Sequence, residues 1–188
     1  SKYTQSDMLV RLLKGYFYTN DRKDLSYYGI DYSEEDSFIV LIINLEEDNT
    51  NMEERLRKIM MIGLLSEEKL KGKMFNYKII DILEEDIVVI LSDGKKKLDK
   101  DGVDKIIDEL RDTFESIEDV EIQLWCGEIE QGILGISKSY QSAKEARNMG
   151  KLVQDIAQNA DAVEKFYYPT DWEVQLINNL KLGKKEAV

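Results

Sequence analysis

The stretch "MFNYKIIDILEEDIVVILS" (residues 74–92) decides the fold class. It holds two apolar, β-branched runs, 74–83 and 86–92, and only a few acidic residues separate them. Runs of this length and composition predict β-strands. A connection this short has no room for the helical crossover that parallel neighbours need, so the two strands are predicted to pair as an antiparallel hairpin.

Two further strands are predicted on either side of the hairpin. Residues 38–43 are six consecutive apolar residues, which predict a central strand buried on both faces. Residues 120–125 alternate apolar with polar side chains, which predicts a strand with one solvent-exposed face.

Three amphipathic helices are predicted between and after these strands. The first opens with a capping box, Thr50 and Glu53, and the third begins at about Lys138. Their apolar stripes are, in chain order, Leu56, Ile59, Met60, Gly63 and Leu64; Val103, Ile106, Ile107, Leu110, Phe114 and Ile117; and Tyr140, Ala143, Ala146, Met149, Val153 and Ile156. The order β–α–β–β–α–β, followed by a helix, predicts an α+β fold (an α/β sandwich). Its core is a ferredoxin-like antiparallel sheet with helices on one face.

The N-terminal part is predicted to be helical. Residues 6–17 carry a leucine-rich stripe that Ser6 or Asp7 caps and that Gly15 closes. A tyrosine-rich segment then holds a further helical turn that ends at Gly29.

The C-terminal part is predicted to leave the domain. Residues 165–169 suit a short edge strand stopped by Pro169, and a second capping box, Thr170 and Glu173, then opens a helix. The predicted division is a helical lead-in at 1–34, a core domain at 35–168 and an exit helix at 169–188.

Composition limits the possible chemistry. The 188 residues, 43% of them hydrophobic, are enough for one core, and no signal peptide or membrane-spanning run is present, which predicts a soluble, cytoplasmic chain. The chain has no histidine, so Ser-His-Asp and Cys-His catalysis are excluded and a metal site would need oxygen ligands only. The single cysteine, Cys126, is interpreted as a small apolar filler of a strand.

Charge argues against direct contact with nucleic acid. The chain has 38 acidic and 26 basic residues, a net charge of −12, and such a surface repels a polyanion. The densest lysine cluster, 93–102, is interrupted by aspartates and is interpreted as a solvated loop.

The predicted core, with carboxylates at its central hairpin, resembles the GGDEF domain of bacterial diguanylate cyclases. In that family two glycines of the hairpin let the backbone approach the nucleotide, and acidic residues hold magnesium against the phosphates. The segment "LEEDI" (83–87) occupies the place of that motif. Leu83 and Glu84 stand where the glycines belong, Glu85 and Asp86 keep acidic character, and Ile87 replaces a phenylalanine.

The resemblance therefore implies a site that has lost its chemistry. Asn44 takes the position of a further metal-binding aspartate at the end of the first strand, with Glu46 nearby, and a neutral amide is a poor partner for a divalent cation. Asn44, Glu46 and the hairpin acids Glu84, Glu85 and Asp86 are expected to be residues of a solvated sheet edge. No catalytic, cofactor-binding or metal-binding residue is assigned, no cofactor is expected, and the chain is expected not to be an enzyme.

The C-terminal half narrows the resemblance. The segment "GEIEQGILGISKSYQSAKEARNMGKL" (127–152) is similar to the degenerate GGDEF-like domains of bacterial transcription regulators, in which a Gly-rich loop leads into a Ser-Tyr-x-x-Ala helix. Both ends of the chain resemble the AraC-type, YesN-like regulators more than the CdaR/PucR-like group. This resemblance implies a helix-turn-helix DNA-binding region after Val188 and a sensor, membrane-anchored in many relatives, before Ser1.

These observations leave three functions to compare. The first is a non-catalytic relay or dimerisation domain, a homodimer formed through helices or a sheet edge, whose candidate surface is Met8, Leu9, Leu12 and Leu13 with Trp172, Leu176 and Leu180. Those residues are equally well explained as a cover for the open side of the domain itself. The second is a sensor that binds a nucleotide or metabolite without turnover, at the loop with Gly127, Gly132 and Gly135 and at Tyr140. The third, an active nucleotidyl cyclase or phosphotransferase, is disfavoured by the lost glycines and by Asn44.

Overall fold

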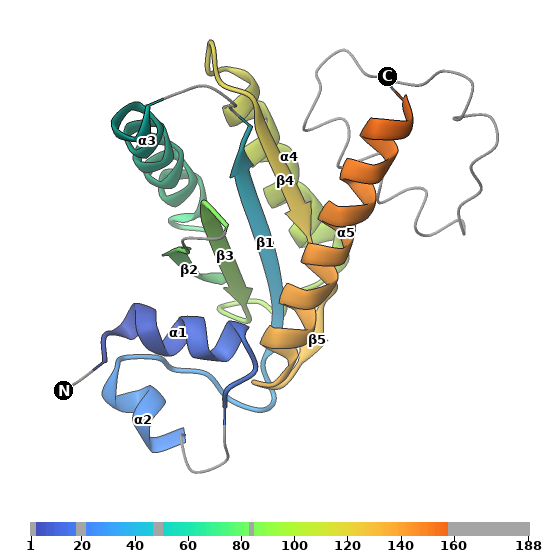
Figure 1. Cartoon of the computed structure of the whole chain (residues 1–188). Coiled ribbons are helices and arrows are strands. Elements are labelled where there is room, and N and C mark those ends of the chain that lie inside the picture. Colours follow the sequence, from blue (N-terminus) through green and yellow to red (C-terminus); the bar gives the residue numbers. More distant parts are fainter. Residues whose placement is uncertain (1–2, 18–21, 47–50, 83–84, 158–188) are drawn as a thin grey trace.

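A computed structural model describes residues 3–17, 22–46, 51–82 and 85–157 of the chain (Figure 1). The helices and strands in chain order are α1 Gln5–Leu13, α2 Arg22–Tyr27, β1 Ser37–Leu45, α3 Met52–Leu70, β2 Asn76–Asp81, β3 Ile87–Ser92, α4 Lys100–Glu115, β4 Ile122–Cys126, β5 Glu130–Gln131 and α5 Gly135–Ala157.

The strands form one antiparallel sheet in the order β2-β3-β1-β4, and the short β5 extends it beside β1. Strands β2 and β3 are the predicted hairpin, in a register that runs from Asn76 opposite Ser92 to Asp81 opposite Ile87. This strand order is that of a ferredoxin-like β–α–β–β–α–β core, so the predicted α+β fold class is confirmed.

The central strand β1 is buried on both faces, as predicted. Its residues Ile39, Leu41 and Ile43 join an apolar cluster with α3 and α4, while Phe38, Val40 and Ile42 join a second cluster with α1 and α5. Figure 1 shows α3 and α4 on one side of the sheet and α1 and α5 on the other. Helices therefore cover both faces of the sheet rather than one.

Helix α1 belongs to the domain core. Thr4 is its N-cap and forms a capping box with Asp7, so the predicted cap at Ser6 or Asp7 is wrong by a few residues. Gly15 follows the helix at a φ of +79°, the conformation that a glycine adopts most easily after a helix, and its predicted closing role is confirmed. The four apolar residues of the stripe (Met8, Leu9, Leu12 and Leu13) are buried in the cluster that covers β1. Of the two explanations for this stripe, the cover for the domain itself holds, and α1 offers no exposed apolar surface there.

Helix α3 was predicted at the right place but with the wrong inward face. Asn51 is its N-cap and accepts a hydrogen bond from the Glu54 amide at 2.8 Å, while Thr50 of the predicted capping box lies outside the described residues. The buried residues of the helix are Ile62, Ser66 and Leu70. In contrast, Leu56, Met60 and Leu64 of the predicted stripe are 52%, 66% and 65% exposed.

Strand β4 is covered on both faces, which corrects the prediction of a wet face. Gln123 and Trp125 point toward α5 and are fully buried, whereas Ile122 and Leu124 belong to the cluster with α4. The ring of Trp125 fits against Gly150 of α5: a Cβ built at that glycine would lie 2.4 Å from the ring. A side chain at position 150 would therefore displace either the helix or the indole.

A buried serine joins α5 to the sheet. Ser139 Oγ accepts a hydrogen bond from the Val40 amide at 2.9 Å and donates one to the Glu128 carbonyl at 2.6 Å, at the gap between β4 and β5. Gly127 allows this approach, because a Cβ there would lie 2.1 Å from the Ser139 carbonyl oxygen. Helix α5 begins at Gly135, three residues before the predicted start, and Tyr140, Ala143 and Ala146 are buried as predicted.

The predicted strand at 165–169, the capping box of Thr170 and Glu173, and the exit helix with Trp172, Leu176 and Leu180 lie outside the described residues. Within the described residues, no helix combines the length and the apolar character that crossing a bilayer requires.

Candidate functional site

The acidic hairpin lies beside the carboxyl end of β1. Glu85 and Asp86 precede β3, and the Glu85 amide donates to the Ile82 carbonyl at 2.9 Å, which turns the chain back. Ile87 begins β3 and pairs with Ile43 of β1. Leu83 and Glu84 lie outside the described residues, so the structure places only the second half of the predicted motif.

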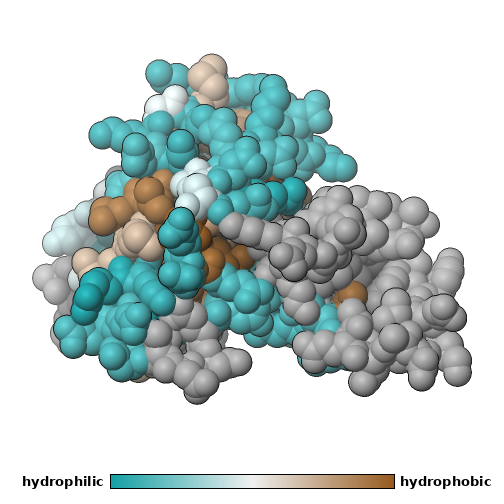
Figure 2. All heavy atoms as spheres, turned by 90° about the horizontal axis from the view of Figure 1, so that it is seen from above, coloured by the Kyte–Doolittle hydropathy of each residue, from teal (hydrophilic) through white to brown (hydrophobic). Residues whose placement is uncertain are grey.

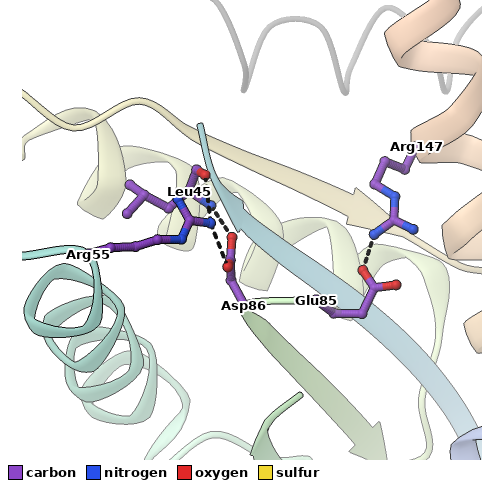
Figure 3. Close-up of polar contacts among 5 residues, drawn as sticks. All are labelled: Leu45, Arg55, Glu85, Asp86 and Arg147. Atoms are coloured by element: carbon purple, nitrogen blue, oxygen red, sulfur yellow. Dashed lines mark hydrogen bonds and ion pairs between the residues drawn. The ribbon is translucent and has the colours of Figure 1, made fainter. Parts of the chain in front are cut away.

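Asp86 ties the hairpin to both β1 and α3 (Figure 3). One carboxylate oxygen accepts from the Leu45 amide at 2.8 Å, and the other accepts from the Arg55 guanidinium at 2.7 Å. The same guanidinium donates to the Leu45 carbonyl at 3.3 Å. The Arg55 and Asp86 side chains are 27% and 14% exposed, so this ion pair is partly withdrawn from water.

Glu85 points in the opposite direction, toward α5 (Figure 3). Its side chain is only 4% exposed, and it forms an ion pair with Arg147 and accepts a hydrogen bond from the Tyr140 hydroxyl at 3.2 Å. Burial lowers the pKa of the Arg147 guanidinium from its ordinary value, but an arginine this close to a carboxylate remains charged. Both described hairpin carboxylates are thus neutralised by arginines of the chain itself. The expectation that Glu85 and Asp86 belong to a solvated sheet edge is wrong.

The other two polar residues of the predicted edge lie next to β4. Asn44 pairs in register with Gln123, and its Oδ1 atom is buried without a hydrogen-bond partner among the described residues. Glu46 is exposed and accepts from Gln123 Nε2 at 2.7 Å, as a solvated edge predicts. Gln123 is the connecting residue, since its Nε2 also lies 3.4 Å from Gln154 Oε1 of α5.

The described residues do not fit the divalent cation that the family resemblance implies. Magnesium and calcium require several oxygen ligands converging on one point. Glu85 and Asp86 diverge toward opposite helices, and each meets an arginine that would repel a cation. Among the described residues no group of three or more His, Cys, Asp or Glu side chains is arranged to hold a metal ion.

The Gly-rich loop and Tyr140, proposed from sequence as a ligand pocket, serve packing in the structure. Gly127 lies against the Ser139 backbone, and a Cβ at Gly135 would lie 2.8 Å from the Glu130 side chain. Tyr140 is buried and donates its hydroxyl to Glu85.

Cys126 lies at the end of β4 and its thiol donates to the Gly127 carbonyl at 3.2 Å. Burial, together with the charge of Asp104, raises the pKa of the Cys126 thiol to about 12. Such a thiol is protonated at neutral pH and is a poor nucleophile, which agrees with the interpretation of Cys126 as a structural filler.

Two of the concavities lined by described residues lie away from the hairpin. One, of about 450 Å³, lies between the end of α3 and the edge strand β2, where Tyr32, Lys73, Lys78 and Lys95 are among its lining residues. The other, of about 470 Å³, lies between the ends of α1 and α5. Its described lining is Leu13, Lys14, Tyr16, Ser137, Lys138, Gln141 and Lys144, so the charged residues of this lining are lysines.

Sequence reasoning found the hairpin acids but missed their partners, Arg55 and Arg147. Arg55 is 31 residues from Asp86, and Arg147 is 62 residues from Glu85. No local pattern links such positions. A carboxylate that is known to be buried implies a cationic partner. That signal could not be used here, because the sequence predicted Glu85 to be solvated.

Comparison with known proteins gives one result. A family model described as a GGDEF-like domain matches residues 22–149, which is more than half of the chain and spans the five described strands, from α2 into α5. No curated protein and no solved structure matched the chain.

Proposed function

Because the chain belongs to the family of GGDEF-like domains, we propose that it is a non-catalytic, regulatory member of that family. In this proposal it is a cytoplasmic relay and dimerisation domain of a bacterial transcription regulator of the AraC type. It connects a sensor on its N-terminal side to a helix-turn-helix DNA-binding region on its C-terminal side. The regulator context is supported by the resemblances of residues 127–152 and of both ends of the chain, and the net charge of −12 suits a piece that does not itself touch DNA.

One observation carries the non-catalytic part of the proposal: the two described hairpin carboxylates are held by Arg147 and Arg55. Nucleotidyl transfer in related folds depends on acidic residues that hold metal against triphosphate. Here those acids stabilise the packing of α3 and α5 on the sheet instead. Releasing either one for a metal ion would leave a partly buried arginine without its counter-ion, and the cost opposes metal binding.

The test is direct. The chain is incubated with GTP and either magnesium or manganese, next to an active GGDEF domain as a positive control, and products are separated by chromatography. We expect no cyclic dinucleotide and no pyrophosphate above a no-protein blank. Product formation that disappears on Asp86→Asn would refute the proposal, because it would show that the hairpin carboxylate still holds a metal.

A second candidate function is ligand sensing without turnover, and the basic concavity between α1 and α5 favours it. Three lysines (Lys14, Lys138 and Lys144) in a chain of net charge −12 would attract a small anion. A thermal-shift screen with phosphates, nucleotides and carboxylates tests it. A stabilising anion whose effect is lost on Lys138→Gln would favour this candidate, and flat melting temperatures throughout would remove its support.

A further inference from the structure

Helix α3 carries a row of large apolar side chains that the fold leaves exposed. Met52, Leu56, Met60 and Leu64 follow one another at intervals of four residues, and their exposed fractions are 70%, 52%, 66% and 65%. Met61, beside them, is 37% exposed. Seen from above, hydrophobic residues gather between hydrophilic ones on the side of the molecule where Figure 1 places α3 (Figure 2). Single exposed apolar residues are common in proteins, but a contiguous row on one helix marks an interaction surface.

The opposite face of the same helix already packs on the domain. Ile62, Ser66 and Leu70 are buried, and Ile59 packs against the apolar cluster that contains Ile62 and Leu70. The exposed row is therefore not required to fix α3 on the sheet. Its residues remain available to a partner without any change of fold.

We propose that a second copy of this chain packs against this surface, with the two α3 helices antiparallel. The charged residues beside the row favour a second copy of the chain over any other partner. With about 3.6 residues per turn, antiparallel packing around a two-fold axis level with Ile62 places Met60 and Leu64 of both copies at the centre. In that arrangement Arg57 of each copy lies beside Glu68 of the other, and Glu53 lies near Lys71 of the other.

The surface is therefore self-complementary, which an isologous dimer requires. Arg57, Glu53, Glu68 and Lys71 are exposed, so they are accessible to a partner. Two copies that each carry a net charge of −12 repel one another over most of their surface, and a local pattern of matched charges selects one orientation. A docking site for an unrelated protein would not need acidic and basic residues that match each other across its own two-fold axis.

This inference deepens the proposed regulatory function, because it names the surface through which the domain dimerises. One helix of 19 residues makes a contact at the small end of known interfaces. We therefore expect a weak, concentration-dependent dimer with a dissociation constant on the order of 10–100 µM. A weak contact is suited to a relay, since a sensor that brings two chains together would shift the equilibrium strongly.

Sedimentation equilibrium of the full 188-residue chain over a concentration series tests the proposal. We expect Leu64→Glu to weaken dimerisation at least tenfold, because it places two charges at the centre of the contact. Leu134→Glu is the matched control: Leu134 is 54% exposed but lies outside α3, and its replacement should leave the dimer unchanged. Circular dichroism and thermal melts confirm that each variant is folded.

A charge exchange distinguishes a second copy from any other occupant. Arg57→Glu and Glu68→Arg should each weaken the dimer, and the double variant should restore it, since the exchanged charges again face each other only in the antiparallel self-complex. Association that survives Leu64→Glu, or that the double variant fails to restore, overturns the proposal. A chain that stays monomeric and loses stability on Leu64→Glu assigns the surface to an intramolecular contact and also overturns it. Each of these results leaves the GTP turnover assay, and the non-catalytic function it tests, unaffected.

Discussion

Replacing Arg147 by methionine should show how strongly the hairpin depends on its ion pair. Methionine keeps much of the volume of the arginine stem but leaves the Glu85 carboxylate, 4% exposed, with only the Tyr140 hydroxyl. Removing one partner of a buried ion pair typically costs about 3–5 kcal/mol. Because the Arg147 side chain is still 15% exposed and water can reach the site, we expect about 3 kcal/mol here.

For a chain of this size, a loss of about 3 kcal/mol lowers the melting temperature by roughly 6–12 °C. Urea unfolding, followed by far-UV circular dichroism and by fluorescence, measures the loss in free energy of unfolding. Fluorescence is suitable because Trp125 is buried against α5, the helix that carries Arg147, and reports on the separation of this helix from the sheet. Replacing the carboxylate as well, in the double variant Glu85→Gln with Arg147→Met, removes the unpaired charge. We expect it to recover about 1–2 kcal/mol, a coupling typical of groups in direct contact.

The control is Lys73→Met, which breaks the ion pair between Lys73 and Glu109. Those side chains are 35% and 45% exposed, and such pairs contribute about 0–1 kcal/mol. If Arg147→Met cost no more than Lys73→Met, Glu85 would have access to solvent or to another cation. Arg147 would then not be the group that neutralises Glu85.

Four further outcomes are expected, each measured by urea unfolding of the variant against the parent chain. Ser139→Ala leaves the strand amide that it serves unpaired in the core and should cost about 1–3 kcal/mol; a loss below about 0.5 kcal/mol would contradict its bridging role. Gly150→Ala forces a methyl group into the ring of Trp125 and should cost about 1–3 kcal/mol. Gly63→Ala is its control, because the added Cβ would lie 3.8 Å from its nearest neighbour. This variant should be neutral or gain up to about 1 kcal/mol from helix propensity. Equal effects of the two alanines would contradict the close packing of Gly150 on Trp125. The pKa of the Cys126 thiol rises from 9.0 to about 12 on folding. The stability that the protonated thiol contributes is therefore complete below pH 9 and is lost between pH 9 and 12, as the thiol of the unfolded chain ionises. Cys126→Ala should reduce the fall of the urea midpoint with pH in that range, and an unchanged slope would contradict the role assigned to Cys126.

The sheet could be predicted because its strands carry their own evidence. Residues 38–43 form an apolar run too short for a helix core, and the hairpin connection is too short for a crossover. These two local features predict a buried central strand and an antiparallel hairpin, and the structure contains both.

The faces of the elements could not be predicted in the same way. Helix α3 has apolar residues on two sides, and periodicity alone cannot decide whether Leu56 and Met60 or Ile62 and Leu70 face the sheet. Gln123 looked like a solvent-facing residue because the alternation of β4 is real, but α5 covers that face.

The state of the hairpin acids depended on contacts that are distant in sequence. Whether a carboxylate is free or neutralised is decided by what the tertiary fold brings beside it, here arginines from α3 and α5. From the sequence, the proposed loss of the family's nucleotide chemistry rests on the replaced glycines and on Asn44. The arginine partners of Glu85 and Asp86 are a further, electrostatic observation that supports the same proposal.

The close contact between Gly127 and Ser139 has a consequence for how such chains are identified. Only glycine at position 127 lets helix α5 pack this closely against the end of β4. The Ser139 hydroxyl then accepts the hydrogen bond of the Val40 amide, so this packing requires both residue types together. A sequence profile that relies on this pair sorts proteins by how a helix is attached to a sheet, whatever reaction they perform or have abandoned. A match to such a profile is therefore evidence for the packing of a helix on a sheet. It is not evidence for enzymatic activity in a newly sequenced chain.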